Sequence, residues 1–132
     1  EHCKGQLKLV FGCGGNRDQA KRPLMGDIAS KLADQVIVTN DNPRFENGEQ
    51  IAEQIKAGAK GSASLSIELD RATAIQQLVA SSTSDDIILV AGKGHEDYQQ
   101  IADQKIPFND AKQILSALDR QFEKATKLGA KL

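Results

Sequence analysis

A glycine-rich segment near the N-terminus is the first stretch whose residue types suggest chemistry. Residues 12–18 read Gly-Cys-Gly-Gly-Asn-Arg-Asp and follow an apolar run. Such glycines let backbone N–H groups converge on an anion, and Arg17, Lys21 and Arg22 would add positive charge beside a helix start. The segment is not a dinucleotide fingerprint, because Arg17 stands where the third glycine of GxGxxG belongs. A glycine-rich turn with solvated charges is the alternative, and the pattern alone favours neither.

A second polar segment, Asp41-Asn42-Pro43-Arg44, combines a carboxylate, an amide, a fixed φ angle and a guanidinium. Proline restricts the backbone, and arginine can make a two-pronged contact with a carboxylate that lysine cannot reproduce. Asn, Asp and Pro are also turn residues for purely local reasons. Taken alone, the segment is more typical of a plain turn than of a site.

A third segment, Gly92-Lys93-Gly94-His95-Glu96-Asp97, superficially resembles a phosphate loop. The first glycine of a Walker motif is missing, and His95 stands where Ser or Thr would contact magnesium. A structural metal is disfavoured, because three successive side chains in a loop rarely point to one centre. Glu96 could instead accept hydrogen bonds from a ligand ammonium. The alternative is a simple solvated loop in which His95 is packed and satisfied.

Four apolar runs place these segments at one edge of a predicted sheet. Their alternation with helical patterns predicts a Rossmann-like α/β fold, with a mainly parallel sheet and helices on both faces. In such a sheet, the loops after the first, second and fourth strands emerge at the carboxyl edge, where open α/β sheets bind ligands. The runs are Leu7–Phe11, Val36–Thr39, Ala63–Leu69 and Ile87–Ala91. The third alternates Ser with apolar residues, which favours an edge strand, whereas the fourth is apolar throughout and predicts a strand covered on both faces.

Apolar residues at helical spacing predict four helices, and a C-terminal β-hairpin follows the fourth strand. The hairpin pairs Tyr98–Ile101 with Lys105–Phe108. We expect one domain over residues 1–122 and a frayed tail over 123–132. The apolar residues that mark the four helices are Leu24, Ile28, Leu32 and Ala33; Ile51, Ile55 and Ala59; Ala72, Ile75, Leu78 and Val79; and Ile114, Leu115, Leu118 and Phe122.

Composition excludes several classes of protein. A chain of 132 residues with 39% apolar and 27% charged residues is typical of one globular domain. Its 17 Lys and Arg against 18 Asp and Glu provide no general field for nucleic acid or an anionic membrane. No apolar run approaches the roughly 20 residues that span a bilayer. Cys3 and Cys13 could pair, but they lack the regular spacing of a disulfide framework, so we expect a reduced, cytoplasmic setting.

Taken together and in this order, the three segments resemble the C-terminal domain of the Mur ligases that add meso-diaminopimelate. The likeness rests on residues 10–18 with 21–26, on 41–44 and on 91–99, and it extends from Gly5 to about Leu118. The full enzymes of that family use ATP and Mg²⁺ to activate a carboxylate of UDP-N-acetylmuramoyl-L-alanyl-D-glutamate as an acyl phosphate. The amine of the incoming amino acid then attacks it, which extends a peptidoglycan precursor.

The resemblance also implies which residues bind the amino acid. Meso-diaminopimelate is lysine with an additional carboxylate on its distal carbon, so arginines suit its carboxylates and a glutamate suits an ammonium. Neither a catalytic residue nor a metal ligand is assigned within the chain. The residues that carry over as the meso-diaminopimelate site are Arg17, Asp41, Asn42, Pro43, Arg44, Gly92 and Glu96.

Two positions depart from the family pattern, and the sequence lacks a Walker phosphate loop. Asn16 replaces a frequent Asp, and Asn109-Asp110-Ala111 stands where the family has Ser-Asp-Arg, which removes a positive charge. The chain does not begin with Met, and we expect it to be the C-terminal domain of a longer ligase. ATP and Mg²⁺ would then be bound mainly by other domains, and the isolated domain would not turn over.

Two functions from other classes remain as alternatives. The chain could be a non-catalytic module that binds a small amino acid or a nucleotide at the same sheet edge. It could also be part of a nicotinamide-dependent oxidoreductase, although Arg17 in place of glycine counts against that function. Titration with a nicotinamide cofactor would separate the oxidoreductase from the other two.

Overall fold

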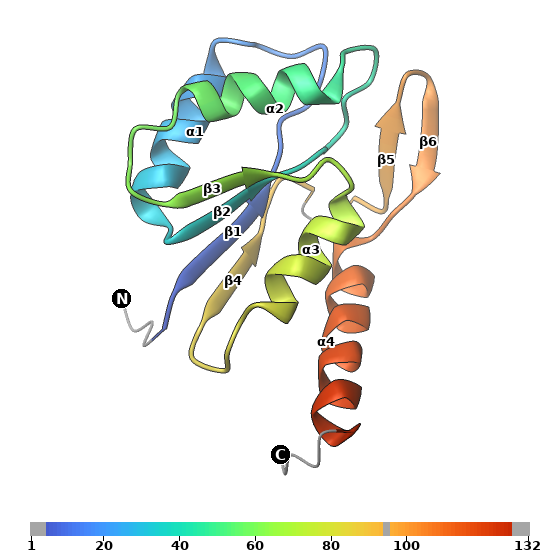
Figure 1. The fold of residues 1–132 in the computed structure, drawn as a ribbon. Coiled ribbons are helices and arrows are strands. Elements are labelled where there is room, and N and C mark those ends of the chain that lie inside the picture. The colour runs from blue at the N-terminus through green and yellow to red at the C-terminus, as the bar shows by residue number, and fades with distance from the viewer. Residues whose placement is uncertain (1–4, 94–95, 128–132) are drawn as a thin grey trace.

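The computed structural model describes residues 5–93 and 96–127, with side chains up to residue 120. A four-stranded parallel sheet lies at its centre (Figure 1). The strands are β1 (Leu7–Phe11), β2 (Gln35–Val38), β3 (Ser64–Ile67) and β4 (Ile87–Val90). They are ordered β3-β2-β1-β4, so β3 is an edge strand, as the serine alternation predicted.

Helices cover both faces of this sheet, which confirms the predicted α/β fold. α1 (Lys21–Leu32) and α2 (Gly48–Ala57) lie on one face, and α3 (Arg71–Ala80) and α4 (Asp110–Lys127) on the other (Figure 1). α4 continues past residue 122, where we expected the domain to end, and residues 128–132 lie outside the described part. Within the described ranges, no helix combines the length and the hydropathy needed to cross a bilayer.

A β-hairpin follows β4 and forms a separate two-stranded sheet. β5 (Tyr98–Ile101) pairs in antiparallel fashion with β6 (Gln104–Pro107), one residue earlier than predicted for the second strand. The hairpin is fastened to the loop after β2 by two backbone hydrogen bonds: Arg44 N donates to Gln100 O at 3.0 Å, and Ala102 N donates to Arg44 O at 2.6 Å.

Side-chain alternation along the central strands divides the core into two clusters. Phe11 and Val38 pack toward α1 and α2, whereas Val10 and Ile37 pack toward α3 and α4. All four side chains are buried. Burial of both faces accounts for the apolar runs in β1 and β2, because each residue meets a helix whichever way it points.

The predicted helix forms as α1, but most of the apolar residues that mark it are exposed. The helix packs closely on α2, and a Cβ on Gly26 would overlap the carbonyl oxygen of Ile55, so only small residues fit at the crossing. The larger apolar side chains Leu24, Ile28 and Leu32 are exposed, and Ile28 and Leu32 line an apolar groove beside β1 and β4. A similar shift occurs on α4, where Ile114 and Ala117 pack inward while Leu115 and Leu118 are exposed.

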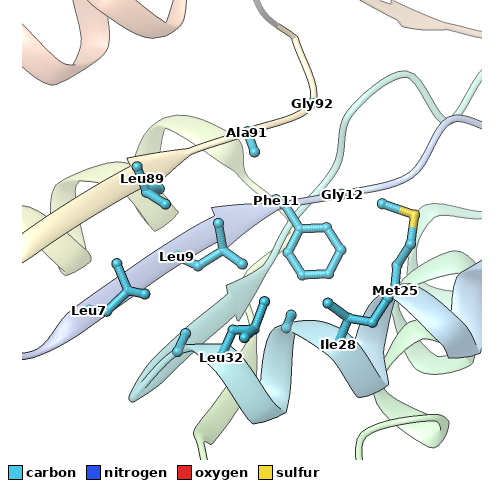
Figure 2. Close-up of a pocket in the computed structure, with 12 residues that line it drawn as sticks. Leu7, Leu9, Phe11, Gly12, Met25, Ile28, Leu32, Leu89, Ala91 and Gly92 are labelled. Atoms are coloured by element: carbon cyan, nitrogen blue, oxygen red, sulfur yellow. The ribbon is translucent and has the colours of Figure 1, made fainter. Parts of the chain in front are cut away.

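The prediction that the fourth strand is covered on both faces is wrong. β4 forms the second edge of the sheet, and Leu89 is 50% exposed. Between β4, β1 and α1 lies an apolar groove, in which Leu7, Leu9 and Leu89 face Ile28 and Leu32 (Figure 2). None of the residues lining it is charged, so the groove does not suit a charged ligand.

Candidate functional site

The loops that follow β1 and β2 meet at the carboxyl edge of the sheet, as the sequence predicted. Gly15 N, in the first loop, donates a hydrogen bond to Asn42 O in the second at 2.7 Å. A Cβ on Gly15 would overlap the carbonyl oxygen of Pro43, so this close approach requires glycine. The loop after β4 reaches the same place through Lys93 and Glu96.

Two predicted site residues, Arg17 and Arg44, converge beside Gly14. A Cβ on Gly14 would lie 2.8 Å from Arg44 Nη1 and 3.5 Å from Arg17 Cγ. Arg44 Nη1 donates to Gly15 O at 2.9 Å and to Asn42 O at 3.4 Å, which anchors one nitrogen of the guanidinium. Arg17 is exposed. Its Nη1 donates to Asn16 O at 3.3 Å, whereas the guanidinium of Arg44 lies beside Gly14. Two arginine side chains that meet at Gly14 suit a carboxylate.

The backbone of Arg44 is in the left-handed region, with φ 54°. This conformation costs a residue with a Cβ roughly 1–2 kcal/mol. The two hydrogen bonds to the β-hairpin hold the backbone in this state. Strained residues held by their surroundings cluster at ligand sites, so the conformation of Arg44 supports a role beyond turn formation.

An acidic corner forms where Asp41 and Asn42 meet the loop after β4. The side chain of Lys93 is completely buried, and its Nζ donates to Asp41 Oδ1 and Asn42 Oδ1 at 3.0 Å each. Glu96 Oε1 lies 4.0 Å from this Nζ and accepts a hydrogen bond from Asn42 Nδ2 at 3.3 Å. Two carboxylates thus share one cation. Glu96 is 38% exposed and can still accept hydrogen bonds from a ligand.

The remaining predicted site residues shape the loops. Asn42 and Pro43 are buried, and Asn42 Oδ1 also accepts from Gln100 N at 2.9 Å. Gly92 is exposed and lies beside Asp41, with φ 112°. The polar groups of Asn42 are therefore engaged within the protein. The sequence did not predict the contact of Gln100 with Asn42, because a glutamine in a strand does not indicate which loop it will contact.

Arg22 does not contribute positive surface, which corrects the prediction for the first loop. Its guanidinium is buried and pairs with Glu46, with Nη2 2.9 Å from Oε2 and Nη1 3.1 Å from Oε1. It also donates to Gln54 Oε1 at 2.8 Å and to Gly14 O at 3.1 Å. Arg22 therefore clamps the first two loops and α2 together beneath the site.

The carboxylate of Glu46 has a pKa below its ordinary value, because Arg22 and the backbone N–H of Asn16 donate hydrogen bonds to it. Hydrogen bonds from the backbone N–H groups of Gln6 and Thr83 likewise lower the pKa of Asp86. A carboxyl group with a lowered folded-state pKa stabilises the fold above its unfolded pKa. This contribution is lost as the pH falls through the folded-state pKa.

We therefore expect the free energy of unfolding to decrease as the pH is lowered from about 6 to 3, through the ordinary range of these carboxyl groups. Glu46→Gln should lower stability near neutral pH and flatten this dependence. Urea unfolding followed by circular dichroism across the pH range measures both effects. The matched control is Glu53→Gln, at an exposed position of α2. An unchanged pH slope in Glu46→Gln would show that the Arg22 clamp does not depend on charge.

A second buried ion pair joins the elements below the site. Arg71 Nε and Nη2 each donate to one oxygen of Asp110 at 2.8 Å. The same guanidinium donates to Asn40 O at 3.2 Å and to Ala91 O at 3.1 Å, at the ends of β2 and β4. Asp110 lies in the Asn109-Asp110-Ala111 sequence, which departs from the family pattern. Both of its carboxylate oxygens are bound by Arg71, so Asp110 is not free for a ligand.

The remaining candidates for chemistry are a cysteine and a metal site. Cys13 is unpaired, and burial raises the pKa of its thiol, which disfavours a reactive thiolate. Cys3 and His95 lie outside the described residues. In the part of the chain that the structure describes, no three His, Cys, Asp or Glu side chains could hold a metal ion together.

Fold and site together define a Rossmann-like α/β domain with a charged loop site at the carboxyl edge of its sheet. The chain belongs to the Mur ligase family, because residues 1–94 match the family model described as "Mur ligase, glutamate ligase domain".

Individual relatives are similar over most of the chain. It is 52% identical over 118 residues to UDP-N-acetylmuramoyl-L-alanyl-D-glutamate--2,6-diaminopimelate ligase of Coxiella burnetii, covering 89% of this chain and 24% of that protein. The Haemophilus influenzae protein of the same name is 48% identical over 118 residues, which cover 89% of this chain and 24% of that protein. A solved structure of such a ligase superposes with a TM-score of 0.86 at 43% identity, over 92% of this chain and 25% of the other. The chain thus spans about a quarter of the length of these relatives.

Proposed function

We propose that this chain is the C-terminal, amino-acid-binding domain of a cytoplasmic ATP-dependent ligase of peptidoglycan synthesis. The ligase would join meso-diaminopimelate to UDP-N-acetylmuramoyl-L-alanyl-D-glutamate, and residues 1–122 would form the domain. The observation that carries this proposal is the placement of Arg17 and Arg44 beside Gly14 and of Glu96 beside Asn42, whose carbonyl oxygen accepts from Arg44. One amino-acid centre of meso-diaminopimelate has the complementary charges, a carboxylate for the arginines and an ammonium for the glutamate.

The domain would position the nucleophile rather than activate the acyl group. Its charged residues would hold one end of meso-diaminopimelate and so orient the amine that attacks the acyl phosphate. ATP, Mg²⁺ and the UDP-linked substrate would be bound mainly by other domains of the longer protein. Formation of the UDP-linked tripeptide from meso-diaminopimelate by that protein, followed by chromatography, tests this function. A ligase that uses only another amino acid would contradict it.

Glu96→Gln should raise the Michaelis constant for meso-diaminopimelate by roughly tenfold or more, since a charge-assisted hydrogen bond contributes about 1.5–3 kcal/mol. The substitution keeps the shape of the side chain and removes its charge. The Michaelis constant for ATP should change little. Steady-state kinetics of the longer ligase with each substrate measures both constants. Asp97→Asn, at the exposed neighbouring position, is the matched control. Equal effects of the two substitutions would assign Glu96 to a solvated loop.

A further inference from the structure

Lys93 lies between the loops of the proposed site, although the motifs and the family resemblance assign it no role. It is a lysine without any exposed side-chain surface, and a buried ammonium is costly unless it is paired. Its Nζ contacts groups from two loops: Asp41 and Asn42 after β2, and Glu96 after β4. The Tyr98 ring of β5 lies 6.0 Å from the same atom. Lys93 therefore connects three separate segments at one point.

The contacts of Lys93 with the two carboxylates are unequal. Asp41 is 12% exposed and accepts a hydrogen bond from Nζ at 3.0 Å, whereas the more exposed Glu96 lies 4.0 Å away. The lysine charge is thus used mainly by Asp41. The three side chains carry a net charge of −1, and the incompletely paired negative charge is on Glu96, where a ligand can reach it.

Lys93 also acts on Glu96 through Asn42. Asn42 Oδ1 accepts from Lys93, which turns Asn42 Nδ2 toward Glu96 Oε1 at 3.3 Å. The reversed amide would place its N–H₂ group against the lysine ammonium. Lys93 and the backbone N–H of Gln100, which also donates to Asn42 Oδ1, together fix the amide orientation of Asn42 and so the donor that Glu96 receives.

We propose that Lys93 is a positioning residue for recognition of the ligand's ammonium. It neutralises Asp41 and orients Asn42, which leaves a single negative charge on Glu96 for the ligand. This inference rests on the proposed function. A merely structural lysine would only fill a cavity. The role proposed for Lys93 requires a defined charge balance with Asp41 and Glu96.

The test changes this balance in the longer ligase, with Asp41→Asn, Lys93→Met and the double variant. Asp41→Asn makes the net charge of the three positions zero, Lys93→Met makes it −2, and the double variant restores −1. We expect Asp41→Asn to raise the Michaelis constant for meso-diaminopimelate roughly tenfold, since one charged contact contributes 1.5 kcal/mol or more. Lys93→Met should also raise it, because the two carboxylates lose their shared partner. The double variant should recover to within about threefold of the unmodified ligase, because the two substitutions are coupled.

The Michaelis constant for ATP should stay within about threefold in all three variants, because ATP is bound mainly by other domains of the ligase. A double variant as weak as the product of the single effects would overturn the proposal. If Lys93→Met or the double variant does not fold, the proposal is tested by Asp41→Asn alone. An unchanged Michaelis constant for meso-diaminopimelate in Asp41→Asn would then overturn the proposal. Failure of the unmodified ligase to use meso-diaminopimelate would instead overturn the proposed function.

Discussion

Replacing Arg44 by alanine is expected to lower kcat/KM for meso-diaminopimelate roughly 100-fold or more, corresponding to about 3 kcal/mol. Meso-diaminopimelate differs from lysine only by its distal carboxylate, which a guanidinium can contact with two nitrogens. Arg44 Nη1 is anchored on Gly15 O, which holds the guanidinium beside Arg17. A site built around a charged partner rejects an analogue that lacks the partner group, because its own polar group is left unpaired.

The comparison with lysine as substrate separates recognition from loop structure. Arg44→Ala should harm the weak reaction with lysine much less, so the ratio of the two efficiencies should fall. Alanine also carries a Cβ, so the left-handed backbone strain at this position is retained. Arg44→Lys should recover only part of the loss, because an ammonium cannot make the paired contact. An equal loss with both substrates would mean that Arg44 supports the loop and does not recognise the carboxylate.

Arg71→Met is expected to lower the free energy of unfolding by about 3–5 kcal/mol, the cost of leaving the partner of a buried ion pair without its counter-charge. Arg71 has no exposed side-chain surface and holds Asp110 with two hydrogen bonds of 2.8 Å. The substitution also removes the donors for Asn40 O and Ala91 O, which lie where β2 and β4 lead into the site loops. Urea unfolding followed by circular dichroism measures the loss.

A double variant distinguishes the cost of the unpaired charge from the loss of packing. Arg71→Met combined with Asp110→Leu should be more stable than Arg71→Met alone, because it removes the uncompensated carboxylate. Lys112→Met, at an exposed position in the first turn of α4, is the control and should change stability by less than about 0.5 kcal/mol. If Arg71→Met also changed stability by less than about 0.5 kcal/mol, the pair of Arg71 with Asp110 would not be needed for the fold.

The alternation of strands and helices, and the edge at which the site loops meet, were predictable from the sequence. β-branched and apolar runs indicate strands, and parallel strands bring their following loops to one edge. The turn at 102–104 predicted the hairpin for a similarly local reason. The order of the three loop motifs pointed to Arg17, Arg44 and Glu96 by resemblance, although no motif alone distinguished a site from a turn.

Only the tertiary structure decided which charged residues serve the fold and which remain available at the site. Arg17, Arg22, Arg44 and Arg71 have the same chemistry in the sequence. Arg22 and Arg71 are buried because they meet Glu46 and Asp110, 24 and 39 positions away, and Arg17 and Arg44 converge because their loops cross at Gly14. The burial of Lys93 and the exposure of the larger apolar residues of α1 depend equally on packing between distant segments. Periodicity reports which residues share a face, but the partner of that face is determined by how the elements pack.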